Sequence, residues 1–262
     1  MPPDADLTAR MDASLAAYWG SYGLAEGALF RQLPGALFVY TPIPLYLFNS
    51  VILTGRDPAA IDAALGAAAG CIAGKGVPVL WRLSPSAVSD AVRARLEAAG
   101  LKRHGREPAM LASITGLPPV RPVDGLRIAS VEGRPGRHDW AWLTCDAFEL
   151  TPAVRSAMSR CEAAVPEAAY AHQARFTGYL DGRPVAVSAL VMAGGLAGIY
   201  AVATLPEARR RGVGTAMTLH AMAEGRRRGA SMAVLQATDF GRPVYERIGF
   251  SVAFDYDLYL QS

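Results

Sequence analysis

The chain has 262 residues, of which 52% are hydrophobic and 19% charged, and its formal net charge is +3. This apolar content excludes a disordered chain, because disordered chains lack the apolar surface that offsets the entropy of ordering. The length exceeds one ordinary domain of roughly 100 to 200 residues and predicts two domains. Lys75 and Lys102 are the only lysines, so any cationic site must be built from arginine, whose guanidinium group is always charged and is fork-shaped.

The first half of the chain alternates between apolar runs typical of strands and periodic segments typical of helices. Predicted helices cover residues 7–18, 57–71 and 86–99, and predicted strands cover residues 36–40, 49–53, 77–83 and 109–113. Ser84-Pro85 is a helix start signal and Gly100 a stop signal for the last helix.

A proline-rich passage, Gly116-Leu-Pro-Pro-Val-Arg-Pro-Val-Asp-Gly125, separates this half from the next. Such composition is typical of a linker between domains. We therefore predict a first domain at residues 1–115, a linker at 116–124 and a second domain at 125–262.

The second half also interleaves strands with helices, which predicts a mixed sheet with helices packed on it. Predicted helices cover residues 140–148, 152–165, 210–228 and 243–248, and predicted strands cover residues 126–131, 172–180, 184–192, a segment ending at 204, 231–236 and 250–259. Asp181-Gly182 is a strong two-residue hairpin turn.

Two uncharged stretches, residues 35–55 and 185–205, are long enough to cross a bilayer. Pro42 and Pro44 interrupt the first and Gly194-Gly195 the second, so both are predicted to be pairs of buried strands rather than membrane spans. The three cysteines and four histidines are scattered, which predicts no structural metal. Without a recognisable leader, we expect a cytoplasmic protein.

The two halves look like imperfect copies of each other. Residues 77–101 and 232–250 both run from a strand through a turn into a helix that ends at a glycine. Aligning Gly100 with Gly249 places Leu96 opposite Tyr245, so only the second copy has a hydroxyl there.

The segment Val202-Ala-Thr-Leu-Pro-Glu-Ala-Arg-Arg-Arg-Gly-Val-Gly-Thr215 carries most of the predicted chemistry. A helix N-terminus is already positive and has free N–H donors, so three more arginines there indicate a bound anion. A phosphate or pyrophosphate fits, and Gly212 and Gly214 would let it approach the backbone. The loop lacks the G-K-[ST] of a P-loop and the third glycine of a dinucleotide fold.

The pattern R-x-x-G-x-G, formed by Arg209, Gly212 and Gly214, resembles the acyl-CoA loop of the GNAT superfamily of N-acyltransferases. Tyr245-x-x-x-Gly249-Phe250 is similar to the family's second motif. The resemblance covers about residues 124–262 and implies a mixed, mostly antiparallel sheet flanked by helices. The first half resembles a degenerate repeat, as in tandem members, and is given no cofactor because it lacks R-x-x-G-x-G.

The resemblance also implies that the second domain binds acetyl-CoA. A splayed strand edge would hold the pantetheine arm, and the helix N-terminus would hold the pyrophosphate. Thr238 stands where many members carry asparagine. The implied cofactor-binding residues are Val202, Ala203, Thr204, Arg209, Arg210, Arg211, Gly212, Val213, Gly214, Thr215 and Thr238.

The implied reaction is direct attack of a primary amine, on a small molecule or peptide, on the thioester. A strand N–H would stabilise the oxyanion, and Tyr245 would protonate the departing thiolate. The alternative for Tyr245 is a packing residue. No general base is implied; Asp146, Glu149 and Glu167 are candidates, each with a solvated surface charge as its alternative.

The sequence is also compatible with a function other than acyl transfer. An acyl-CoA-binding regulatory protein or pseudoenzyme stays open as the alternative, because no base is identifiable. Nucleic acid is not expected, since the two arginine runs lie roughly 27 Å apart along one helix at 1.5 Å per residue. Arg226, Arg227 and Arg228 sit at a helix C-terminus, where the dipole favours cations. The assembly is left open, with a homodimer as one option.

Overall fold

The computed structural model describes residues 4–117 and 122–262, so residues 118–121 of the predicted linker lie outside the described residues. In the first half the long helices are α1 (Ala5–Tyr22), α2 (Pro58–Lys75) and α3 (Asp90–Ala98). The strands are β1 (Leu29–Leu33), β2 (Ala36–Tyr40), β3 (Ser50–Leu53), β4 (Val79–Leu83) and β5 (Lys102–Ser113), with a short 3-10 turn, η1 (Tyr46–Phe48).

The second half has the same kinds of element in a similar order. Its helices are α4 (Gly133–Ala147), α5 (Pro152–Ala164), α6 (Val213–Arg227) and α7 (Arg242–Arg247), with 3-10 turns η2 (Glu167–His172) and η3 (Pro206–Ala208). Its strands are β6 (Leu126–Ser130), β7 (Gln173–Leu180), β8 (Arg183–Ala193), β9 (Leu196–Thr204), β10 (Met232–Gln236) and β11 (Ser251–Gln261).

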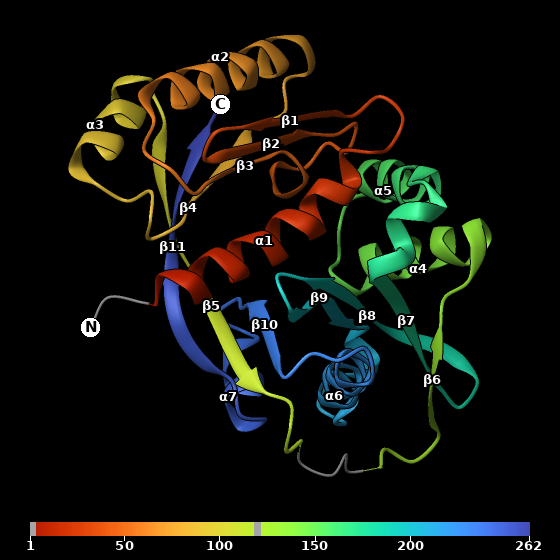
Figure 1. The fold of residues 1–262 in the computed structure, drawn as a ribbon. Helices are drawn as coiled ribbons and strands as arrows, with labels where there is room; N and C mark the ends of the chain where they lie inside the picture. The colour runs from red at the N-terminus through yellow and green to blue at the C-terminus, as the bar shows by residue number, and fades with distance from the viewer. Residues whose placement is uncertain (1–3, 118–121) are drawn as a thin grey trace.

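The strands of the described residues form one sheet in the order β1-β2-β3-β4-β11-β5-β10-β9-β8-β7-β6 (Figure 1). The pairs β3–β4 and β9–β10 are parallel, and the other paired neighbours are antiparallel. The predicted fold class, a mixed and mostly antiparallel sheet with flanking helices, is confirmed.

The internal repeat is visible in the topology. The series β2-β3-α2-β4-α3-β5 and the series β8-β9-α6-β10-α7-β11 each contain an antiparallel pair followed by a parallel crossover. The closing strands are exchanged: β11 lies between β4 and β5, and β5 lies between β11 and β10. The sheet is therefore continuous through both predicted domains, whose boundary stays a prediction.

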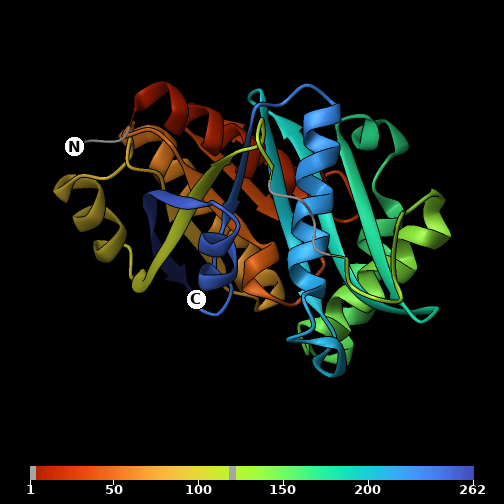
Figure 2. The same ribbon diagram turned by 90° about the horizontal axis from the view of Figure 1, so that it is seen from below.

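Helices cover both faces of this sheet. On one face, α2 and α3 pack on the first half, and α6 and α7 pack on the second, where α6 lies lengthwise along β8 and β9 (Figure 2). On the other face lie α4, α5 and α1, which crosses the middle of the molecule (Figure 1). Tyr18 of α1 stacks on Tyr200 of β9 with ring centroids 4.3 Å apart. The first helix thus joins the two halves.

Several local predictions are confirmed. Residues 35–55 and 185–205 each contain a pair of strands, and within the described residues no helix is long and apolar enough to cross a membrane. Asp181 and Gly182 both have positive φ, as the tight hairpin turn requires. Cys145 and Cys161 are buried, whereas Cys71 is half-buried.

Other local predictions were wrong in their bounds. β1 was missed because three of its five residues are exposed, which removes the apolar alternation. β5 begins at Lys102, seven residues before its predicted start, because its polar end is held by pairing with β11. The predicted helix at 86–99 begins only at Asp90, where Ser89 caps it, and α4 begins earlier than predicted, at Gly133.

Candidate active site

The parallel strands β9 and β10 separate at the centre of the second half. They pair only at Ala197 and Gly198 of β9, and β9 then runs on to Thr204 without a strand on that edge among the described residues. A bulge at Ala201, whose φ is +48°, turns the strand at this point. Backbone groups of Val202, Ala203 and Thr204 therefore border a gap on the side away from β8.

The corresponding strands of the first half stay together. β3 and β4 pair at all four positions from Ser50 to Leu53. The helix that connects them, α2, is capped by Asp57, whose carboxylate accepts from the N–H of Ala59 at 3.1 Å. The first half therefore has a closed pair of parallel strands and a capped helix where the second half has a gap.

The loop between β9 and α6 ends in an open helix N-terminus. Arg210 and Gly212 have φ of +61° and +83°, so the predicted helix at 210–228 begins only at Val213. No side chain caps this end, and the first amides of an α-helix have no partner inside the helix. Arg210 and Arg211 are exposed and form no ion pair with the described residues. Free amides and two cations without ion pairs among the described residues form a candidate site for an anion.

Gly212 and Gly214 have distinct reasons to be glycine. Gly212 occupies the left-handed region, where a side chain is strained. A Cβ on Gly214 would lie 3.6 Å from Oγ1 of Thr204, which shows how closely the helix start approaches the end of β9. Val213 is buried and packs the start of α6 against the hydrophobic core between this helix and the sheet.

Arg209 is positioned differently from the next two arginines. Its Nε donates to the carbonyl of Thr204 at 3.0 Å, and its Nη2 donates to the carbonyl of Ala147 and to Oε1 of Glu149, both at 2.9 Å. Arg209 therefore ties the end of β9 to the end of α4. Its predicted contact with a cofactor stays a prediction.

Tyr245 lies on α7, on the same face of the sheet as α6. Its ring packs against Phe250 with centroids 5.9 Å apart, and burial raises the pKa of Tyr245 to about 12. The phenol therefore keeps its proton throughout the physiological pH range. Thr238 holds the turn that precedes α7, because its Oγ1 accepts from the N–H of Gly241 at 3.1 Å.

Each of the three predicted candidate bases lies against an arginine. Asp146 pairs with Arg155 at 2.5 Å, and Glu149 pairs with Arg209 at 2.9 Å. Glu167 pairs with Arg137 at 2.8 Å. No group of three His, Cys, Asp or Glu side chains that could hold a metal ion occurs among the described residues.

Two polar residues beside the gap were missed by sequence reasoning. Gln236, the last residue of β10, has both amide atoms buried without a hydrogen-bond partner in the described part of the chain. It lies two residues from Val234 on β10, so its side chain is on the same face of the sheet as Val234, the face that carries α1 and α4. The signal available in the sequence was an amide at the end of an apolar strand.

Glu107 was missed because it belongs to the first half. Exchange of the closing strands places β5 next to β10, with Ala109 paired to Gln236. Glu107 lies two residues from Ala109, on the same face of the sheet, and accepts from Nε of the buried Arg82 at 2.9 Å. The first half therefore contributes a carboxylate near the end of β10.

Comparisons with known proteins agree with this geometry. Residues 193–253 match the family model for the acetyltransferase (GNAT) domain, and no curated protein matches. A GCN5-related N-acetyltransferase from Kribbella flavida is 19% identical with a TM-score of 0.66, the match covering 95% of each chain. One from Sphaerobacter thermophilus is 16% identical with a TM-score of 0.59, covering 99% of this chain and 94% of that one.

A tandem GNAT protein from the clavulanic acid biosynthesis pathway is 12% identical with a TM-score of 0.58, covering 95% of this chain and 94% of that one. At these identities the likeness concerns the fold, which extends over nearly the whole chain. The family-model match covers the splayed strand, the arginine loop, α6 and Tyr245. Residues 193–253 are therefore similar to the GNAT acetyltransferase domain, and the fold of nearly the whole chain is similar to that of the solved GNAT structures.

Proposed function

We propose that this protein is an N-acetyltransferase that moves the acetyl group of acetyl-CoA to a primary amine on a small molecule or peptide. The observation that carries the proposal is the gap between β9 and β10, which leads to the uncapped start of α6 beside Arg210 and Arg211. A cytoplasmic location is part of the proposal and is supported by the free, buried thiols of Cys145 and Cys161.

Acyl-CoA would bind along this gap in the second half. The amides of residues 210–215 and the guanidinium groups of Arg210 and Arg211 would hold the pyrophosphate. The free edge of Val202 to Thr204 would hydrogen-bond the pantetheine arm, and Arg209 would keep Thr204 in place. The chain would then be a tandem GNAT protein whose first half binds no acyl-CoA, since β3 and β4 stay paired.

In the transfer step the amine nitrogen forms a bond to the acyl carbon, and the carbon–sulfur bond breaks. A strand N–H at the gap would stabilise the charge that develops on the carbonyl oxygen. Tyr245 would give its proton to the departing thiolate, and the amine would lose a proton to a base. Burial raises the pKa of Tyr245 to about 12, so the phenol is protonated and available as the donor at neutral pH.

The acceptor would approach from the face that carries α1 and α4. Gln236 has a carbonyl and an amide available there, so it would hydrogen-bond a polar group of the acceptor. Glu107 lies on the neighbouring strand β5, two residues from Ala109, which pairs with Gln236. It would receive the amine proton directly or through water. The first half thereby serves the reaction in the second.

The second candidate function is acyl-CoA binding without transfer. It is favoured by the arginine ion pairs that engage all four carboxylates considered as bases, which are Glu107, Asp146, Glu149 and Glu167. The two functions share the cofactor site and differ in turnover.

Acetyl-CoA binding by calorimetry and thiol release with a panel of primary amines would separate them. Thiol release that depends on an amine, with stoichiometric N-acetylated product, is the result expected for the enzyme. Binding of acetyl-CoA without release for any amine would favour the regulatory function. Absence of acetyl-CoA binding would contradict both.

A further inference from the structure

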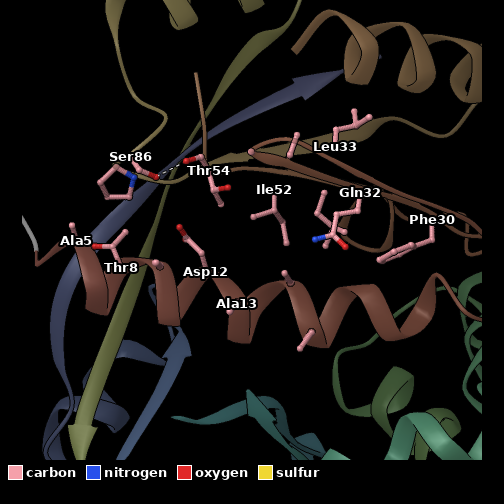
Figure 3. Close-up of a pocket in the computed structure, with 17 residues that line it drawn as sticks. Ala5, Thr8, Asp12, Ala13, Phe30, Gln32, Leu33, Ile52, Thr54 and Ser86 are labelled. Atoms are coloured by element: carbon pink, nitrogen blue, oxygen red, sulfur yellow. Dashed lines mark hydrogen bonds between the residues drawn. The ribbon is translucent and has the colours of Figure 1, made fainter. Parts of the chain in front are cut away.

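A hollow of about 710 Å³ lies in the first half, between α1 and the strands β1 to β3 (Figure 3). One wall is formed by small side chains of α1, including Ala9 and Ala13. The opposite wall is formed by Phe30, Leu37 and Ile52 of the sheet. Its size falls within the range of small-molecule sites, roughly 300 to 1,000 Å³.

The hollow is separate from the proposed acyl-CoA gap. It opens on the side of α1 that faces β1 to β3, whereas Ser14 and Tyr18 of the same helix contact Tyr200 of β9. By the internal repeat it lies at the carboxyl ends of β3 and β4, on the face opposite α2. That is the counterpart of the side of β9 and β10 on which Gln236 lies.

Asp12 lies at one end of this hollow and is 5% exposed. One carboxylate oxygen accepts from the hydroxyl of Tyr256 and the other from that of Ser84, both at 2.7 Å. The described residues contain two other buried acidic side chains, Glu162 and Asp257, and each pairs with an arginine. Asp12 has no such cation among them, although an ionised buried carboxylate normally requires one.

The hydroxyl groups near Asp12 leave only acceptors for a ligand. Ser84 gives its proton to Asp12, Ser86 can give its proton to the carbonyl of Thr54 at 2.9 Å, and Thr8 gives its proton to the carbonyl of Asp4 at 2.8 Å. Thr8 and Ser86 also line the hollow. An ammonium group has three donors and no acceptor, so it complements this set of oxygens, whereas an anion would be repelled.

We propose that this hollow is a second ligand site, which binds a small primary ammonium compound with an apolar body. The ammonium lies against Asp12, Thr8 and Ser86, and the apolar body lies between Ala13 on α1 and Ile52 on β3. The ligand supplies the cation that this buried carboxylate lacks among the described residues.

The site can be tested by calorimetric titration of the full chain near neutral pH with 2-phenylethylammonium and with its uncharged analogue 2-phenylethanol. The ammonium compound should bind saturably and about tenfold or more tightly than the alcohol, as expected for a hydrogen bond to a buried charge. Asp12→Asn should remove this preference.

Because Asp12 also bonds Tyr256 and Ser84, a second variant keeps the test independent of folding. Ala13→Phe fills the hollow from an exposed helical position and should weaken binding about tenfold or more. Ala69→Phe, at an exposed position of α2 outside the hollow, should leave binding unchanged. Equal binding of ammonium and alcohol, no saturable binding, competition by acetyl-CoA, or binding unaffected by Ala13→Phe would overturn the proposal.

Discussion

The main chains of Ala109 and Gln236 pair across β5 and β10, so a strand of the first half borders the strand whose end carries the unpartnered amide. This pairing exists because the two closing strands of the repeat are exchanged. The acceptor side of the proposed reaction is therefore assembled from both halves, whereas the cofactor side belongs to the second half alone.

Gln236→Leu should raise stability while lowering activity. Removing a buried amide without partners should increase the free energy of unfolding by about 1 kcal/mol, as measured by denaturant unfolding. The KM for the amine should rise and the KM for acetyl-CoA should stay constant. Met232→Leu, on the same strand and face, is the matched control and should change neither constant. Loss of stability in Gln236→Leu would show that the amide has a partner.

Arg210→Glu combined with Gly212→Asp should weaken acetyl-CoA binding about tenfold or more. The change reverses a charge at the open helix end and places a side chain at a positive φ. Calorimetric titration of acetyl-CoA measures the effect. Arg226→Glu, at the opposite end of α6, should bind acetyl-CoA normally. Unchanged affinity in the double variant would refute the assignment of the pyrophosphate site.

Tyr245→Phe should lower kcat about 100-fold or more while leaving the affinity for acetyl-CoA unchanged. The ring and its packing on Phe250 are kept, so only the proton donor is lost. Because burial raises the pKa of Tyr245 to about 12, any alkaline decline of kcat below that pH should be the same in the variant's residual activity. A normal kcat would make Tyr245 a packing residue.

Glu107→Gln and Glu149→Gln should differ in their effect on turnover. Glu107 lies on the face from which the amine would approach, so its variant should lower kcat. Glu149 is bound to Arg209, and its variant should mainly affect the binding of acetyl-CoA. Equal kinetics of Glu107→Gln and the parent chain would exclude Glu107 as the base.

Asp12 should make the folded chain more stable in acid. Burial raises its pKa from 3.8 to about 6, so the folded chain retains a proton that the unfolded chain has released between these values. The stabilisation is complete below about 3.8 and is lost as the pH rises through about 6, a change on the order of 3 kcal/mol. Unfolding of Asp12→Asn across this range should lack that dependence, and an identical profile in both chains would contradict a raised pKa.

The sequence by itself determined the features that depend on neighbours along the chain. Apolar periodicity and turn residues predicted most strands and helices, and Asp181-Gly182 predicted its hairpin. The arginine loop was recognised because the residues that form a helix N-terminus are consecutive, so their spacing is itself the signal. Even there, the positive φ of Arg210, which delays the helix to Val213, was not evident from the sequence.

Only the tertiary structure decided which distant segments meet. The exchange of β5 and β11 brings Glu107 beside the end of β10, and no local pattern encodes a pairing between strands of different halves. The burial of Asp12 likewise depends on Tyr256 of β11 and on Ser84, which directly follows β4. Such contacts are fixed by packing and register across the whole sheet, whereas the loop that would bind the cofactor is formed by consecutive residues of one short segment.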